Sequence, residues 1–224
     1  MFTKQDGYYE ITTAGYIVFA LIALIAVVAV GVFFQSKKET SKKFNVKTLV
    51  FSAIALSIAY VLSYIQPYKL PWGGSVTLFS MLFITLIGYW YGLKAGLTVA
   101  LAYSILQFIQ SGGSYILTPF QVCCDYFFAF TALGLSGLFK GKKNGLLIGY
   151  IVAIAVRGLF HTVGGYLYWM EYMPEDFPKA LAWAYPIIYN YAYIVIEGVA
   201  TVILISIPPV KKALAQVKQM ATEA

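Results

Sequence analysis

Seven long apolar segments constrain this chain more than any other feature of its sequence. Each holds about 20 residues, the length that an α-helix needs to cross the hydrocarbon core of a bilayer, although two are shorter. Of the 224 residues, 60% are hydrophobic and only 11% are charged, a balance that excludes a soluble domain of this size. The segments cover approximately residues 14–34, 46–66, 75–92, 95–110, 119–139, 145–169 and 184–207. We therefore predict an all-α integral membrane protein.

The lysines are distributed unevenly among the loops that join these segments. Alternate loops and the C-terminal tail carry twelve of them: Lys37, Lys38, Lys42, Lys43, Lys47, Lys94, Lys140, Lys142, Lys143, Lys211, Lys212 and Lys218. The loops on the other side carry only Lys4, Lys69 and Lys179. Because basic loops stay in the cytoplasm, this pattern places the N-terminus outside a cell membrane and the C-terminus inside. The net charge of +7 resides in these loops and does not indicate nucleic-acid binding.

Composition divides the chain into three parts. Residues 1–42 hold the first apolar segment and a lysine-rich linker, residues 43–208 hold the other six segments, and residues 209–224 form a basic cytoplasmic tail. The first segment is longer than the core of a signal peptide and precedes its basic run, so we predict a retained helix. We expect a six-helix bundle plus one additional N-terminal transmembrane helix. No loop is long enough to fold alone, so an ATPase would be another polypeptide.

Residues 157–169 place an arginine and the only histidine of the chain inside an apolar segment. Positions four apart share one face of a helix, so Arg157, His161 and Trp169 form a stripe. A charge at this depth is retained only when it faces the protein interior and finds a partner. With a rise of ~1.5 Å per residue, Arg157 and Glu197 both reach the midplane of the bilayer. A buried ion pair between them is one explanation, and direct contact with a ligand is the other.

Three other polar side chains converge at a shallower level. Asp125, His161 and Asn190 each lie about six residues from the outer end of a segment, hence ~9 Å below the outer surface. Gln121 lies one turn above Asp125. The outer loops and rims carry aromatic residues, namely Trp72, Tyr115, Trp169, Trp183 and Tyr185. This convergence predicts a small-molecule pocket open to the outside, although each residue alone also has a structural interpretation, such as interface anchoring or bonding between helices.

The side chains at this level indicate the class of ligand. A carboxylate, a histidine, an amide and several aromatic rings suit a planar, nitrogen-rich cation. Thiamine, which joins an aminopyrimidine to a thiazolium, meets these demands. One histidine and one aspartate fall short of a metal site, and no serine or cysteine is placed with His161 and an orienting acid. We therefore expect a binding protein without a cofactor or a metal, and not an enzyme.

Several motifs resemble the thiamine-binding S-component family of energy-coupling-factor vitamin transporters. The likeness runs from Lys43 to the tail and includes KFNVKTLVFSAIALSIAY at 43–60, YGLKAGL at 91–97, SYILTPFQVCCDY at 114–126 and GLSGLF ending at Phe139. The resemblance implies that the ligand is bound by Asp125, His161, Trp169, Tyr185, Asn190, Tyr115 and Trp72. It also implies a subunit that captures thiamine outside the cell and works with a transmembrane coupling subunit and two ATPase subunits.

The sequence departs from the family pattern mainly in its acidic residues. The stretch GGSVTLFSMLF at 73–83 has no acid where the family usually has a glutamate, a loop histidine is replaced near Gly113 and Ser114, and Asp125 replaces a longer glutamate. Fewer negative charges predict weaker binding or a different substrate. An S-component for another vitamin is therefore one alternative. A stand-alone proton-coupled secondary transporter is a second, and a membrane enzyme acting on a heterocycle is a third.

Small residues on the second segment suggest a close helix contact. Ala55 and Ala59 lie four residues apart, with Ala53 and Ser57 beside them, and so share a face that a neighbouring helix can approach closely. This face either docks on the coupling subunit or packs within the chain itself.

Overall fold

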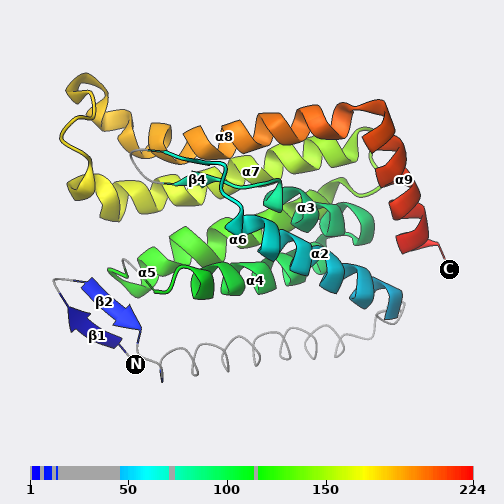
Figure 1. Cartoon of the computed structure of the whole chain (residues 1–224), viewed down its shortest axis with the longest axis horizontal. Helices are drawn as coiled ribbons and strands as arrows, with labels where there is room; N and C mark the ends of the chain where they lie inside the picture. Colours follow the sequence, from blue (N-terminus) through cyan, green and yellow to red (C-terminus); the bar gives the residue numbers. More distant parts are fainter. Residues whose placement is uncertain are drawn as a thin grey trace.

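The computed structural model describes residues 2–5, 8–11, 14, 46–70, 74–113 and 116–223. Within these ranges the chain is an all-α membrane protein, because five helices are long and apolar enough to span a bilayer. A sixth apolar helix, Ser80–Tyr91, is shorter. Most of these helices run along the long axis of the molecule (Figure 1). Apart from Ala14, the N-terminal helix predicted at 14–34 lies outside the described residues, as does most of its linker.

The predicted spans agree with the observed helices to within a few residues at most ends. The helices are α2 (Val46–Tyr64), α3 (Ser80–Tyr91), α4 (Leu93–Gln110), α7 (Gly145–Gly164) and α8 (Tyr185–Ser206). Short turns extend two of them: η3 (Gly165–Trp169) and η4 (Met170–Tyr172) follow α7, and η5 (Lys179–Ala184) precedes α8. All of these helices except α3 have apolar residues over about the length that crosses a bilayer, whereas α3 has only 12 residues.

One further span is a composite helix with irregular backbone. It comprises α5 (Pro119–Val122), the π-helical turn η1 (Cys123–Phe128), α6 (Ala129–Thr131) and the 3-10 segment η2 (Ala132–Phe139). Its start follows from the sequence, since Thr118 caps the first turn by accepting a hydrogen bond from the Gln121 backbone N–H, and Pro119 stands where no donor is needed. The π-helical turn carries Asp125. Such turns are frequent at functional sites.

The segment predicted at 75–92 is helical only from Ser80 onward. Before it, β4 (Ser75–Val76) pairs antiparallel with β3 (Tyr68–Lys69). Phe79 adopts the left-handed conformation with φ 60° and ψ 24°, so the helix cannot extend through it. A short apolar run does not distinguish strand from helix by periodicity, which explains the difference. A second hairpin joins β1 (Phe2–Gln5) to β2 (Tyr8–Ile11).

The tail predicted at 209–224 forms an additional helix, α9 (Pro208–Thr222). It folds across one end of the bundle and contacts α2, α3 and α8 (Figure 1). Ala221 is buried, and the Lys47 ammonium donates to the backbone oxygen of Glu223 at 2.7 Å. This bond brings the start of α2 to the same end of the bundle as α9.

Ala55 and Ala59 face the interior of the bundle. Their exposed fractions are 6% and 0%, and both belong to the main hydrophobic core. Packing within the chain is therefore the interpretation of this face that the structure supports, and neither alanine is accessible for docking on a partner. The small residues that α2 does expose are Ala53 and Ser57.

Candidate ligand-binding site

A cavity of about 630 Å³ lies between the helices, away from α9. Its walls come from the end of α2, the loop before α3, α4, the composite helix, α7 with its extension, and α8. Five of the residues assigned to ligand binding from the sequence line it together: Asp125, His161, Trp169, Tyr185 and Asn190. Gln121 and Arg157 line it as well, whereas Glu197 does not. The remaining two assigned residues, Trp72 and Tyr115, lie outside the described residues.

Asp125 is held by two neutral donors. Its Oδ2 accepts hydrogen bonds from Trp169 Nε1 at 2.9 Å and from the Nε2 amide of Gln121. The Gln121 side chain is itself fixed, since its Oε1 accepts from the Leu117 backbone N–H at 3.2 Å. A Cβ on Gly164 would lie only 2.7 Å from Asp125 Oδ1, so this glycine allows η1 to approach α7. The carboxylate is positioned without a direct arginine or lysine partner among the described residues.

His161 lies between Asp125 and Arg157. Its Nδ1 is 3.9 Å from Asp125 Oδ1, and its Nε2 accepts from Arg157 Nε at 3.4 Å. Because Nε2 accepts this bond, the hydrogen of the neutral ring lies on Nδ1, toward the carboxylate. The rings of Phe130 and Tyr193 meet the imidazole edge-on at centroid distances of 6.0 and 6.3 Å. The three ionisable side chains therefore form one polar row along the cavity wall.

The expected ion pair between Arg157 and Glu197 is not formed within the described part of the chain. Arg157 instead places its guanidinium 4.3 Å from the centre of the Phe130 ring. Glu197 Oε2 accepts from the backbone N–H of Thr77 at 2.9 Å and from its hydroxyl at 2.6 Å, while Oε1 accepts from the Met81 N–H at 3.4 Å. The two side chains, predicted to share a depth in the membrane, point toward different neighbours.

Glu197 thus stabilises the loop that forms one wall of the cavity. The residues it binds bracket Phe79, whose left-handed backbone is unusual for a bulky side chain. At the other end of this loop, Gly74 has φ +75° and lies against the Tyr193 ring, where a Cβ would come within 2.3 Å of Cδ1. The loop wall of residues 74–79 is therefore fixed by α8 at both ends.

Asn190 uses its side chain to join α8 to α7. Its Nδ2 donates to the backbone oxygens of Pro186 at 2.8 Å and His161 at 3.2 Å, and its Oδ1 accepts from the Tyr193 hydroxyl at 3.3 Å. The amide is 3% exposed. Of its two interpretations, bonding between helices is the one that these contacts support directly.

Aromatic rings on α8 complete the cavity. Tyr185, Tyr189 and Tyr193 follow one another at intervals of four residues, and Tyr185 stacks on Tyr189 at 5.6 Å with an interplanar angle of 14°. Tyr189 and Tyr193 were not among the residues predicted from the sequence, although their spacing from Tyr185 places all three on one face. By contrast, Trp183 is 69% exposed and does not line the cavity, as expected for an interface anchor.

Comparison with known families shows which protein family this chain belongs to. The sequence model of the family described as "Thiamine transporter protein (Thia_YuaJ)" matches residues 49–217. The chain belongs to this family of thiamine transporters. The family expected from the sequence motifs is thereby confirmed, and its members are transporters and not enzymes.

Individual relatives cover the same region. The chain is 30% identical over 162 residues to the thiamine transporter ThiT of Bacillus subtilis. The aligned residues cover 66% of this chain and 82% of that protein. It is 23% identical over 176 residues to ThiT of Lacticaseibacillus paracasei, with coverages of 72% and 84%. The solved structure of ThiT from Listeria monocytogenes superposes with a TM-score of 0.56 at 24% identity, covering 72% of this chain and 94% of that one. This last similarity concerns the fold.

Proposed function

We propose that this protein is the substrate-binding membrane subunit of an energy-coupling-factor importer and that its cavity captures thiamine or a close aminopyrimidine analogue. The observation that carries the proposal is the carboxylate of Asp125, held by Trp169 and Gln121 among aromatic rings. Aromatic faces attract a cation by roughly 0.5 to 2 kcal/mol each. A carboxylate both offsets positive charge and accepts from an exocyclic amine.

The size of the cavity and its carboxylate fit this class of ligand. Its volume of about 630 Å³ lies within the usual range for small-molecule sites. Asp125 is the only acidic residue among the described residues that line it. A cationic ligand therefore depends on this one carboxylate, which supports the prediction of weaker binding than at a site with two acids.

Transport requires partners in this proposal. The described helices contain no ATPase fold, so energy comes from a transmembrane coupling subunit and two ATPase subunits. The coupling subunit would contact an exposed helix face, and the face of α2 that presents Ala53 and Ser57 has the small side chains that allow close approach. The lysine distribution supports an orientation with the cavity open to the outside and the C-terminus in the cytoplasm.

Calorimetric titration of the purified protein tests the ligand. We expect saturable binding of thiamine and of its aminopyrimidine half, and no binding of riboflavin, whose larger ring system carries no positive charge. Mass spectrometry of ligand that co-purifies with the protein identifies the natural substrate independently. If thiamine does not bind while another vitamin does, the S-component assignment survives and the thiamine assignment fails.

A second candidate function is a proton-coupled secondary transporter, because the polar row of Asp125, His161 and Arg157 contains ionisable groups that can exchange protons. Glu197, a third acidic or basic group that could serve such a relay, is instead bonded to Thr77. Uptake in liposomes separates the two functions. A secondary transporter accumulates thiamine with a proton gradient alone, whereas a substrate-binding subunit does so only together with its coupling module and ATP.

A further inference from the structure

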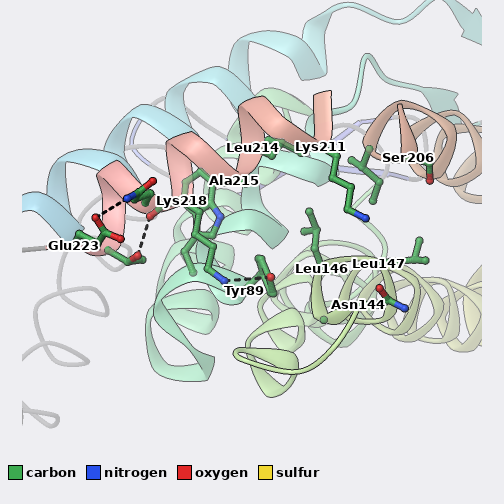
Figure 2. Close-up of a pocket in the computed structure, with 15 residues that line it drawn as sticks. Tyr89, Asn144, Leu146, Leu147, Ser206, Lys211, Leu214, Ala215, Lys218 and Glu223 are labelled. Carbon is green, nitrogen blue, oxygen red and sulfur yellow. Dashed lines mark hydrogen bonds between the residues drawn. The ribbon is translucent and has the colours of Figure 1, made fainter. Parts of the chain in front are cut away.

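A second cavity, also of about 630 Å³, lies at the opposite end of the bundle. It opens between α9 and the ends of α3, α7 and α8 (Figure 2). No residue lines both this second cavity and the site in which we place thiamine. We call this second cavity the α9 groove.

One part of the α9 groove is cationic. Lys211 extends from α9 toward the start of α7 (Figure 2), and no hydrogen bond or ion pair engages its ammonium among the described residues. Lys218 lines the groove about two turns further along α9. It donates to the Tyr89 hydroxyl at 3.2 Å, with its amine 4.3 Å from the centre of that ring. The single acid of the lining, Glu223, accepts from Gln219 at 2.9 Å.

The start of α7 adds to this positive character. Asn144 is in the left-handed conformation and makes no side-chain hydrogen bond to the first turn of this 20-residue helix. The first residues of α7 line the groove, so the positive end of the helix dipole lies beside Lys211. A helix start of this kind favours phosphate when a charged pocket accompanies it.

The other part of the α9 groove is apolar. Its lining includes Leu146 and Leu147 of α7, Ile205 of α8 and Leu214 of α9. These residues lie where the spanning helices end, which is the level of the head groups when the bundle sits in a bilayer. A soluble anion would leave the leucines exposed to water, whereas an amphiphile would cover them.

We propose that the α9 groove binds the head group of an anionic phospholipid of the surrounding bilayer. The phosphate lies between Lys211, Lys218 and the start of α7, and the glycerol and first methylene groups cover the leucines. Basic pockets at the ends of transmembrane helices recognise anionic head groups through the same combination of charge and position. Bound lipid would then join α9 to the bundle and fix this end of the protein at the membrane surface.

Native mass spectrometry of the full chain in detergent, with equal amounts of phosphatidylglycerol and phosphatidylcholine, tests the proposal. We expect retained phosphatidylglycerol to exceed phosphatidylcholine, and we expect Lys211→Glu to reduce this retention about fivefold or more. Lys212→Glu is the matched control, because Lys212 is exposed on the same helix, carries the same charge and does not line the groove. Lys211→Gln should fall between wild type and Lys211→Glu.

Three results would overturn the proposal. The first is equal retention of the two lipids by the wild-type protein. The second is an equal effect of Lys211→Glu and Lys212→Glu, which would indicate surface charge without a site. The third is displacement of the lipid by inorganic phosphate at a similar concentration, which would indicate a soluble anion. A thermal unfolding transition in each variant shows that the variant is folded. An unchanged thiamine affinity shows that a loss of lipid binding at the groove does not arise from damage to the other cavity.

Discussion

The two cavities described above have the same volume, about 630 Å³, and different chemistry. The cavity in which we propose that thiamine binds, called the thiamine cavity below, holds one carboxylate, one arginine and one histidine among aromatic rings. The α9 groove holds two lysines, one glutamate, a helix start without a side-chain cap and several leucines. Since size does not distinguish them, charge decides which molecule each one accepts. The fold places these two sets of side chains at opposite ends of the bundle.

The two cavities also differ in how firmly their polar groups are held. Asp125 has two side-chain partners, and one of these is itself bonded to the backbone. Such pre-organised groups cost little to order when a ligand binds. In the α9 groove, Lys211 is exposed and its charge is partly screened. Substitutions in the thiamine cavity should therefore have the larger effects, and the following predictions test this difference.

Removal of the carboxylate should have the largest effect. Asp125→Asn keeps the shape of the side chain but removes the charge, and charge-assisted hydrogen bonds contribute about 1.5 to 3 kcal/mol. We expect thiamine affinity, measured by calorimetry, to fall about 10-fold to 100-fold. Asp176→Asn is the control, because Asp176 is an exposed acid in the loop after η4 and does not line the cavity. Equal affinities for wild type and Asp125→Asn would remove the electrostatic basis of the assignment.

Substitution of Trp169 should separate its hydrogen bond from its ring. Trp169→Phe keeps an aromatic face but loses the donor to Asp125, and a hydrogen bond contributes about 1 kcal/mol, or roughly fivefold in affinity. Trp169→Ala loses both, so we expect a decrease of more than about tenfold. Trp183→Phe should bind as wild type, since Trp183 is 69% exposed. If both Trp169 variants bind thiamine as tightly as the wild-type protein does, the indole is not part of the site.

Glu197→Gln should act on the loop wall without touching the ligand. An amide offers one acceptor oxygen where Glu197 uses two, so one of its contacts with Thr77 or Met81 is lost. We expect a loss of about 1 to 3 kcal/mol in stability and a decrease of only a few-fold in thiamine affinity. Hydrogen exchange should accelerate at residues 74–81 and remain slow in α4. Fast exchange throughout the chain would instead indicate general unfolding.

The position of Glu197 in the structure also shows which features can be predicted from the sequence and which cannot. Depth follows from counting residues, because the rise per residue of a helix is constant. Counting therefore brought Asp125, His161 and Asn190 to one level, and the structure places all three on one cavity. Direction around the helix axis depends on packing against neighbours. Counting assigned Glu197 the same depth as Arg157, but its carboxylate faces the loop before α3.

The C-terminal helix was missed for a different reason. Its lysines were used only to orient the chain, although Leu214, Val217 and Ala221 recur at intervals of three and four and indicate one apolar face. Pro208 at the first position is also a common helix start. The left-handed Phe79 has no such local signal, since Thr77 and Met81 are fixed by a residue more than a hundred positions away.

Salt should produce the smallest effect on thiamine binding and thereby sharpen the comparison. Raising the ionic strength from about 0.05 M to about 0.5 M shortens the screening length to a few ångströms, which weakens attraction between exposed charges but not between buried ones. The Asp125 side chain is 15% exposed, so we expect thiamine affinity to change less than about twofold. Binding of a fluorescent phosphatidylglycerol at the α9 groove should fall several-fold over the same range. Equal salt sensitivity at both sites would mean that water reaches Asp125 as freely as Lys211, and the contrast between a pre-organised cavity and an open groove would no longer hold.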